Sequence, residues 1–191
     1  DEFFMIRVGS LYDQTFLSKP QIDNKTGMDA AEQLSEIFRA VAPLYKKRDK
    51  IYREVAGLLC EKGIAHPQME SLTAEERSFA EKYFIADVLP VLSPQIMNAH
   101  HPFPHLVNKA LYIVLQMKIS DKTAYGIIPM PAMQDRLIFL PGSGMRYVLL
   151  EELIYQYAER VFDNCEINAK SIICVTRNAD INVDGLPDRK S

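Results

Sequence analysis

Three of the four histidines fall in one short segment, His100-His101-Pro102-Phe103-Pro104-His105, which makes it the first candidate metal site. Adjacent histidines point in different directions, and the two prolines impose an extended, non-helical path. The segment has neither the HExxH spacing nor the paired cysteines of zinc sites, and no Glu or Cys lies nearby. We interpret it as a rigid turn that packs Phe103 and Leu106 into the core, with zinc binding as the alternative.

A second candidate is acidic. The segment Asp180-Ile181-Asn182-Val183-Asp184-Gly185 matches the opening of an EF-hand calcium loop. The twelfth position of such a loop should be a bidentate Glu, and Ser191 stands there. A strand pattern rather than a helix precedes it. We interpret the segment as an acidic strand end and turn, with calcium binding as the alternative.

Phosphate-binding and nucleophile motifs are equally incomplete. The segment Pro141-Gly142-Ser143-Gly144 lacks the GxxxxGK[ST] and GxGxxG patterns and precedes a strand pattern, so it predicts a β-turn. No GxSxG nucleophile elbow occurs. Arg7 and Arg177 stand alone among apolar residues, where each could meet a phosphate or pair with a carboxylate such as Glu2 or Asp180. We therefore assign no catalytic, cofactor-binding or metal-binding residue in this chain.

Composition narrows the class of protein. The chain has 191 residues, 48% of them hydrophobic, and a net charge of −3 without a basic block, which argues against nucleic acid as a main partner. Its three cysteines form no CxxC pair, which favours a reducing, cytoplasmic location. We predict that Cys60 and Cys174 are buried as small apolar residues. No apolar run approaches the roughly 18 residues of a membrane span.

The element around which the rest is organised is a long amphipathic helix over residues 28–63. Its apolar residues recur every three or four positions, and at about 1.5 Å per residue it would extend roughly 50 Å. Thr26, Gly27 and Asp29 offer capping groups at its start, and Gly63 marks its end. Pro43 predicts a kink or break near residues 39–43.

The apolar stripe of this helix is too long for one domain to cover, so we expect another domain or subunit to bury part of it. We assign Val55 and Leu59 to the core of the strand-rich part of the chain, where truncation to Ala would be costly. We assign Leu34 and Phe38 to a surface covered by the helix over residues 1–17 together with a missing domain or a dimer partner. Truncation there is expected to cost little in this chain alone.

The remaining elements predict an α+β fold: N-terminal helices including the long linking helix, followed by a mixed sheet with one or two packed helices. A capping box at Thr73–Glu76 starts a helix that Pro90 ends. The other expected elements are a helix at 1–17, a loop at 18–27, a connector at 64–72, strands at 110–119, 125–130, 137–140, 147–150 and 172–176, with a possible extension at 180–183, and a helix at 151–162.

Five segments taken together resemble one family. They are DEFFMIRV at 1–8, the stretch at 73–92 that ends in YF and VLSP, AHHPFP at 99–104, VLLEELI at 148–154 and VTRNAD at 175–180. In this order they are similar to motifs of bacterial polyphosphate kinases, which make long-chain polyphosphate from ATP. The resemblance covers nearly the whole chain. His105 stands where the family usually has Phe, and Pro43 interrupts the linking helix.

The resemblance implies three parts: residues 1–27 as the last helix and loop of an N-terminal helical domain, 28–63 as the linking helix, and 64–191 as an incomplete middle (head) domain. The family's phosphorylated histidine, Mg²⁺-linked arginines and most ATP contacts would lie in two phospholipase-D-like domains after Ser191. No HxK motif occurs here, and a nucleotide-contacting Asn would precede Asp1. Because the chain starts without Met and ends abruptly, we expect it to be a piece of a longer protein.

The implied function is that of an ATP-polyphosphate phosphotransferase. The whole enzyme would use ATP and Mg²⁺, neither bound by this segment, and this segment would serve structure and dimerisation. ATP and polyphosphate would bind through other domains, and the partner of this segment would be a second copy of the protein, without nucleic acid or a transmembrane segment. The expected location is cytoplasmic, with membrane association of the whole enzyme as a variant. The alternative is an independent α+β interaction module without catalytic activity.

Overall fold

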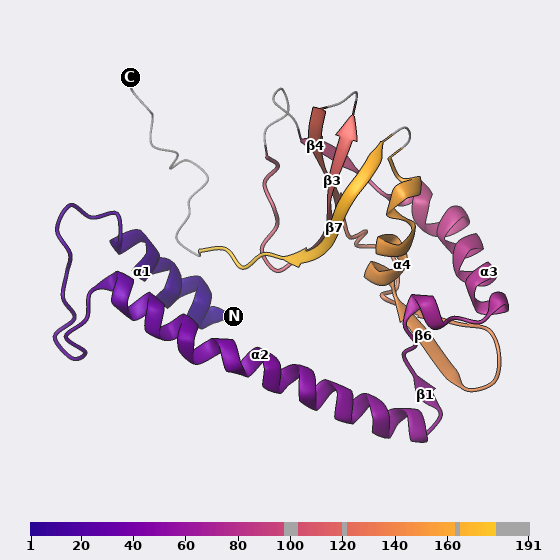
Figure 1. Cartoon of the computed structure of the whole chain (residues 1–191), viewed down its shortest axis with the longest axis horizontal. Helices are drawn as coiled ribbons and strands as arrows, with labels where there is room; N and C mark the ends of the chain where they lie inside the picture. The colour runs from indigo at the N-terminus through magenta and orange to yellow at the C-terminus, as the bar shows by residue number, and fades with distance from the viewer. Residues whose placement is uncertain (98–102, 120–121, 163–164, 179–191) are drawn as a thin grey trace. The chain divides into compact units, whose positions relative to one another are not determined.

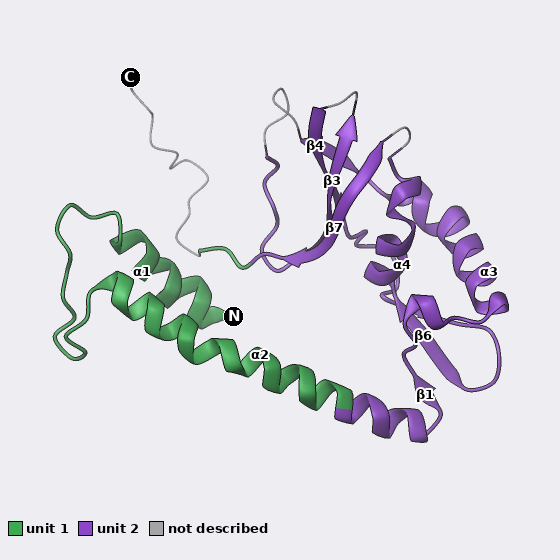
Figure 2. Ribbon diagram, viewed as in Figure 1, with its two compact units in different colours: residues 1–53, 176–191 green, residues 54–175 purple. Residues whose placement is uncertain are grey.

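The computed structural model describes residues 1–97, 103–119, 122–162 and 165–178, which divide into two compact units. One unit consists of Asp1–Arg53 and Thr176–Ser191, and the other of Glu54–Val175 (Figures 1 and 2). Helices dominate the first unit, and two sheets with their helices make up the second. The α+β class and the order of helices before sheets are as the sequence predicts.

The first unit is held together by one small apolar cluster. A π-helical segment, Phe4–Val8, leads into α1, Gly9–Gln14, so the predicted N-terminal helix is confirmed. Leu11 of α1 is buried against Ala30 and Leu34 at the start of α2, Ala30–Glu61. Val8 and Ile37 pack against the same cluster. The three-and-four spacing along both helices therefore brings their apolar faces together.

Both ends of α2 have the chemistry that the sequence predicts. The Glu32 amide donates to Asp29 Oδ1 at 2.9 Å, and the Asp29 amide donates to Glu32 Oε2 at 2.9 Å. This reciprocal pair satisfies two amides that the helix itself leaves without partners. At the other end Gly63 adopts φ 80°, the left-handed conformation that commonly terminates a helix.

The predicted break in α2 at Pro43 is wrong. The helix runs without interruption from Ala30 to Glu61 with Pro43 inside it. Proline removes one amide donor, so the carbonyl of Arg39 loses its helical partner. Both residues are exposed, and water can hydrate that carbonyl. The helical turns on either side therefore continue through the proline.

The predicted burial of Val55 and Leu59 in the core of the strand-rich part is wrong, since these side chains are 47% and 38% exposed. Leu34 is 9% exposed and is covered by α1, as predicted, so the small cost expected for its truncation no longer follows. Phe38 is exposed, which fits its assignment to a surface that a missing domain or a dimer partner would cover. Amphipathic spacing predicts which face of a helix is apolar, but it does not predict which part of the chain covers that face.

The larger sheet of the second unit has four antiparallel strands in the order β2-β4-β3-β7. The strands are β2 Gln95–Met97, β3 Leu111–Ile119, β4 Lys122–Pro129 and β7 Glu166–Cys174. The apolar run after Ala110 forms the central strand β3, as predicted. Strand β7 begins at Glu166, earlier than the predicted Ile172, because its first half alternates polar and apolar residues at the sheet edge.

The smaller sheet has the order β1-β6-β5 and mixes parallel and antiparallel pairs. It consists of β1 Ile64–Ala65, β5 Leu137–Phe139 and β6 Met145–Leu149. The predicted turn at residues 141–144 connects β5 to β6, and Gly142 and Gly144 take φ values of 118° and 91° that favour glycine. The sequence did not predict β1 or β2, which are too short to show a period.

Helices pack against these sheets and close the core. The capping box at Thr73 and Glu76 starts α3, Ala74–Tyr83, as predicted. A 3₁₀ turn, Met69–Ser71, precedes α3, and a π-helical segment, Phe84–Val88, and a second 3₁₀ turn, Leu89–Val91, follow it. The other helix, α4, spans Leu150–Tyr157 and is followed by a 3₁₀ turn, Ala158–Arg160. Figure 1 shows α4 beside β3 and β7.

The main core lies between α3, α4 and the central strand. Phe84, Ile113 and Leu153 are fully buried there, and the Phe84 and Tyr157 rings lie 5.1 Å apart. A second, smaller cluster of Met97, Leu106, Tyr112 and Ile127 lies at the other face of the same sheet. Burial of these large side chains is the main stabilising contribution to the second unit.

The structure predicts a contrast between two leucines of α2. Leu34→Ala should lower the free energy of unfolding by about 2–4 kcal/mol, because it leaves a cavity beside Leu11. Leu58→Ala should change it by less than about 0.5 kcal/mol, because Leu58 is 62% exposed. Because both changes are Leu→Ala in α2, the effect of helix propensity is the same for both and cancels in their difference. Urea unfolding followed by circular dichroism would measure both, and equal losses would contradict this structure.

Candidate functional site

The last of the family-like segments contacts α1 in the helical unit through Asn178. Its Nδ2 donates to Asp13 Oδ2 at 2.7 Å, across 165 residues of sequence. Its side chain also lies against Gly9, where an added Cβ would fall 2.5 Å from Asn178 Oδ1. Gly9 therefore allows the close approach that the hydrogen bond requires. This juncture places residues 176–178 against α1.

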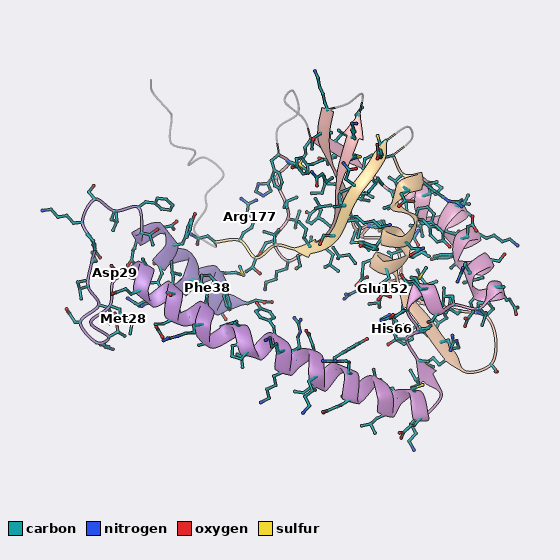
Figure 3. All side chains as sticks on the ribbon, in the orientation of Figure 1. Met28, Asp29, Phe38, His66, Glu152 and Arg177 are labelled. Atoms are coloured by element: carbon teal, nitrogen blue, oxygen red, sulfur yellow. The ribbon has the colours of Figure 1, made fainter. Side chains whose placement is uncertain are left out.

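Arg7 lies in the first of the family-like segments and Arg177 in the last. Arg7 Nη2 donates to Gln33 Oε1 at 2.8 Å, so this arginine bonds the side-chain amide of a residue on α2. Arg177 is half-buried on the segment after β7, where Figure 3 labels it. Asp180, its other suggested partner, lies outside the described residues. Whether either arginine contacts phosphate stays a hypothesis.

The loop that leads into α2 carries a carboxylate held by the backbone. Asp23 Oδ1 accepts from the amides of Thr26 and Lys25, each at 2.9 Å. These hydrogen bonds, first that of Thr26, lower the pKa of Asp23, and the charge of Arg7 contributes less. The turn thus orders the loop between α1 and α2.

In the second unit, His66 forms a site that sequence reasoning missed. Its Nε2 donates to Glu152 Oε2 at 2.7 Å, since an ionised carboxylate can only accept. The imidazole stacks on Tyr147, with ring centroids 5.0 Å apart and an interplanar angle of 7°. Glu152 also accepts from the Leu149 amide at 3.0 Å. Figure 3 shows the two side chains pointing toward one another. A lone histidine gives no sequence signal for this pairing.

Glu76, the carboxylate of the capping box, is buried and paired with an arginine. Arg146 Nε donates to Glu76 Oε1 at 2.5 Å, and its Nη2 donates to Oε2 at 3.2 Å. These bonds hold the pKa of Glu76 below its usual value, while its burial opposes that shift. The same contact raises the pKa of Arg146. The pair joins α3 to β6 and is structural.

The structure does not test most of the candidate metal ligands. His100, His101 and the acidic segment 180–185 lie outside the described residues. Of the predicted turn, Leu106 is buried as expected, but Phe103 is exposed, so its assignment to the core is wrong. In the part of the chain that the structure covers, no three or more His, Cys, Asp or Glu side chains are grouped to hold a metal.

The predicted burial of two cysteines is wrong. Cys60 and Cys174 are both exposed and reduced. Cys60 lies near the end of α2, on the half of that helix whose side chains are largely uncovered. Cys174 ends β7, which is an edge strand. Among the described residues, no helix combines the length and apolar content needed to cross a membrane.

The fold is one already known. The crystal structure of polyphosphate kinase from Porphyromonas gingivalis matches it with a TM-score of 0.69 at 20% sequence identity. The match covers 96% of this chain and 28% of that chain. This chain therefore has the fold of one part of that larger polyphosphate kinase chain.

Sequence comparison shows the family. Residues 1–66 match the profile of the polyphosphate kinase N-terminal domain, and residues 75–189 match that of the polyphosphate kinase middle domain. Polyphosphate kinases from Bacillus cereus and Campylobacter jejuni are 34% and 30% identical, each over 96% of this chain. The chain belongs to the polyphosphate kinase family. It spans 27% of the Bacillus relative and 26% of the Campylobacter relative. The division at residues 28 and 64 stays a prediction.

The contact at Gly9 predicts a selective effect of one methyl group. Gly9→Ala should displace the Asn178 side chain and break its hydrogen bond to Asp13. The helix-forming gain of about 0.5–1 kcal/mol that Ala normally brings should then be reduced or reversed. Gly57→Ala in α2 meets no atom within 4 Å and should show that full gain. Unfolding free energies and the NMR signals of the Asn178 amide would report both effects.

A double-mutant cycle isolates the contact. In an Asn178→Ala background most of the steric conflict is gone, so Gly9→Ala should become more favourable than in the natural chain. Equal effects of Gly9→Ala in the two backgrounds would contradict this account of Gly9.

The Glu76–Arg146 pair predicts a pH dependence. The folded-state pKa of Glu76 lies below its usual value of 4.5, so the pair contributes stability above that pH. The contribution is lost as pH falls through the lower folded-state pKa. Glu76→Gln should therefore cost about 1.5–3 kcal/mol near neutral pH, with the difference from the natural chain shrinking below pH 4.5.

Glu75→Gln is the matched control. Glu75 lies in the same helical turn as Glu76 but is exposed. Its substitution by Gln removes the same charge from the start of the helix. Its effect should stay within about 0.5 kcal/mol. Urea unfolding between acidic and neutral pH would measure all three proteins. A constant difference for Glu76→Gln at every pH would show that the pair does not depress the carboxyl pKa.

Proposed function

We propose that this chain is part of an enzyme that transfers the terminal phosphate of ATP to long-chain polyphosphate. The observation that carries the proposal is the match of two successive polyphosphate kinase domain profiles over residues 1–66 and 75–189. Relatives at 34% identity carry the name polyphosphate kinase. In this proposal the whole enzyme is cytoplasmic, uses ATP and Mg²⁺, and has its phosphorylated histidine in domains beyond those matched here.

The role that we propose for this segment is structural, including dimerisation. Supporting it is the exposed apolar surface along α2. Two successive apolar groups, at 44–45 and 51–52, and a third at 55–59 project from a helix that is otherwise rich in charge. Their exposed members are Leu44, Tyr45, Ile51, Tyr52, Val55, Leu58 and Leu59. A continuous apolar stripe of this length is typical of an interaction surface. A second copy of the protein is the occupant that we propose.

The alternative, an independent interaction module, would use the same stripe without any phosphotransfer. An experiment on the complete protein distinguishes the two proposed functions. Only the first requires ATP to be converted into polyphosphate, whereas both require association through α2. Activity and association must therefore be measured side by side.

We expect the complete protein to form polyphosphate from ATP and Mg²⁺, and residues 1–191 alone to form none. Leu58→Lys should shift the complete protein toward the monomer, because it places a charge in the apolar stripe. Glu54→Lys, one turn away and outside the apolar set, should leave the association largely intact. Polyphosphate formation and sedimentation velocity give the two readouts.

Several outcomes would contradict the proposal. A complete protein without polyphosphate synthesis would favour the interaction module. Phosphorylation of His66 or His105 in residues 1–191 would place catalysis inside this chain, as would phosphorylation of His100 or His101. Unchanged sedimentation of the Leu58→Lys protein would show that α2 does not form the interface between copies.

A further inference from the structure

The net charge of −3 for the whole chain conceals a local excess of positive charge on α2. Residues 46–53, KKRDKIYR, include five Lys or Arg and one Asp, a net charge of +4. When Glu54, the next carboxylate along the helix, is included, the net charge is still +3. Residues 42–55 are all exposed, and Figure 1 shows α1 beside only the first part of α2. Packing within the described chain therefore gives no reason for these cations.

Ion pairs within the helix do not remove this excess. Asp49 Oδ1 accepts from Arg48 Nε at 2.9 Å and from Arg48 Nη2 at 2.7 Å, so the charges of these two residues cancel. Arg53 Nε donates to the Asp49 carbonyl at 3.2 Å, a neutral acceptor that orients the guanidinium without neutralising it. In the described part of the chain, neither Lys46 nor Lys47 pairs with a carboxylate. Lys46, Lys47 and Arg53 therefore carry the excess charge.

Two of these cations lie in line along the helix. Because α2 turns by about 100° per residue, Lys46 and Arg53 lie within about 20° of each other around its axis and about 10 Å apart along it. Lys50 lies between them on the same face. Like charges three or four positions apart repel one another and destabilise a helix. The helix thus keeps an arrangement that is unfavourable by itself and that an anionic partner would make favourable.

The apolar stripe of α2 faces the opposite way. Leu44, Ile51 and Val55 lie about 140–180° around the axis from Lys46. A second copy of the protein that covered the apolar stripe would therefore leave the line of cations accessible. A membrane surface that received the stripe would have Lys46 and Arg53 on the far side of the helix, away from the lipid headgroups. The line of cations therefore favours a polyanion in solution over a membrane.

We propose that this face of α2, formed by Lys46 and Arg53 with Lys47 beside them, is a docking surface for inorganic polyphosphate. An unbranched chain of phosphates can contact Lys46 and Arg53 at the same time, whereas a single phosphate reaches only one of them. Each contact between a phosphate and a cation also releases counterions, which favours binding. The choice of polyphosphate among polyanions rests on the proposed function, but docking itself requires neither ATP nor phosphotransfer.

Titration calorimetry and NMR of the full chain of 191 residues, without ATP, test the docking surface. Long-chain polyphosphate should bind saturably and shift the amide signals of residues 46–53. Orthophosphate at the same total phosphate concentration should bind at least about tenfold more weakly. With three phosphate contacts, the slope of log K against log salt concentration should be about −2 to −3.

Variants test the location. The double substitution Lys46→Gln, Arg53→Gln keeps good helix formers at exposed positions, so the fold should be retained. It should weaken polyphosphate binding by about tenfold or more and make the salt slope less steep by about 2. Lys46→Arg keeps the charge and should bind as the natural chain does. The matched control is Lys19→Gln, Lys25→Gln, which removes two exposed cations from the loop before α2 and should leave binding largely unchanged.

Weaker binding by the variant at 46 and 53, with binding retained by the control, would support the docking surface. Absence of saturable binding, or equal losses in the two double variants, would overturn it. Equally tight binding of single-stranded DNA, or of vesicles of equal parts phosphatidylserine and phosphatidylcholine, would overturn the assignment of polyphosphate as the occupant.

These results are independent of the test of phosphotransfer. A complete protein that makes no polyphosphate, in a chain that still binds it through residues 46 and 53, would contradict the proposed function and support the docking surface. Polyphosphate synthesis by the complete protein, without binding by this chain, would contradict the docking surface alone.

Discussion

Two adjacent carboxylates at the start of α4 connect the layers of the second unit. Glu151 bonds Arg136, the residue before β5, and Glu152 bonds His66, the residue after β1. The helix that carries them packs on β3 and β7 of the other sheet. The positive end of the α4 dipole favours both carboxylates. Because one of them is buried, removal of its arginine would leave an uncompensated charge, which proteins tolerate poorly.

A different constraint acts on α2, which forms more apolar surface than the described chain covers. Its first turns are buried by α1, while the side chains from Leu44 to Leu59 that form the rest of the stripe remain exposed. Helices gain most of their stability in proteins by packing an amphipathic face. The family relatives are about four times longer than this chain, and the exposed stripe is what the proposed dimer contact would bury.

The local elements could be predicted because their signals are local. The capping box at Thr73, the positive-φ glycine at Gly63 and the apolar run of β3 each depend on residues within a few positions of one another. Pro43 misled the prediction because proline's effect depends on solvent access to the freed carbonyl, which the sequence does not show. Burial of Leu34 and exposure of Val55 likewise depend on a neighbour chosen by the tertiary fold.

The candidate sites could not be predicted because they join residues far apart in sequence. Arg146 meets Glu76 across 70 positions, His66 meets Glu152 across 86, and Asn178 meets Asp13 across 165. No spacing rule relates such pairs, and each residue type is common on protein surfaces. The backbone of Lys109 depends on tertiary structure in the same way. Nothing local to this lysine indicates its left-handed conformation, with φ 63°, which is held by the hydrogen bond of its amide to the Val175 carbonyl in the neighbouring strand segment.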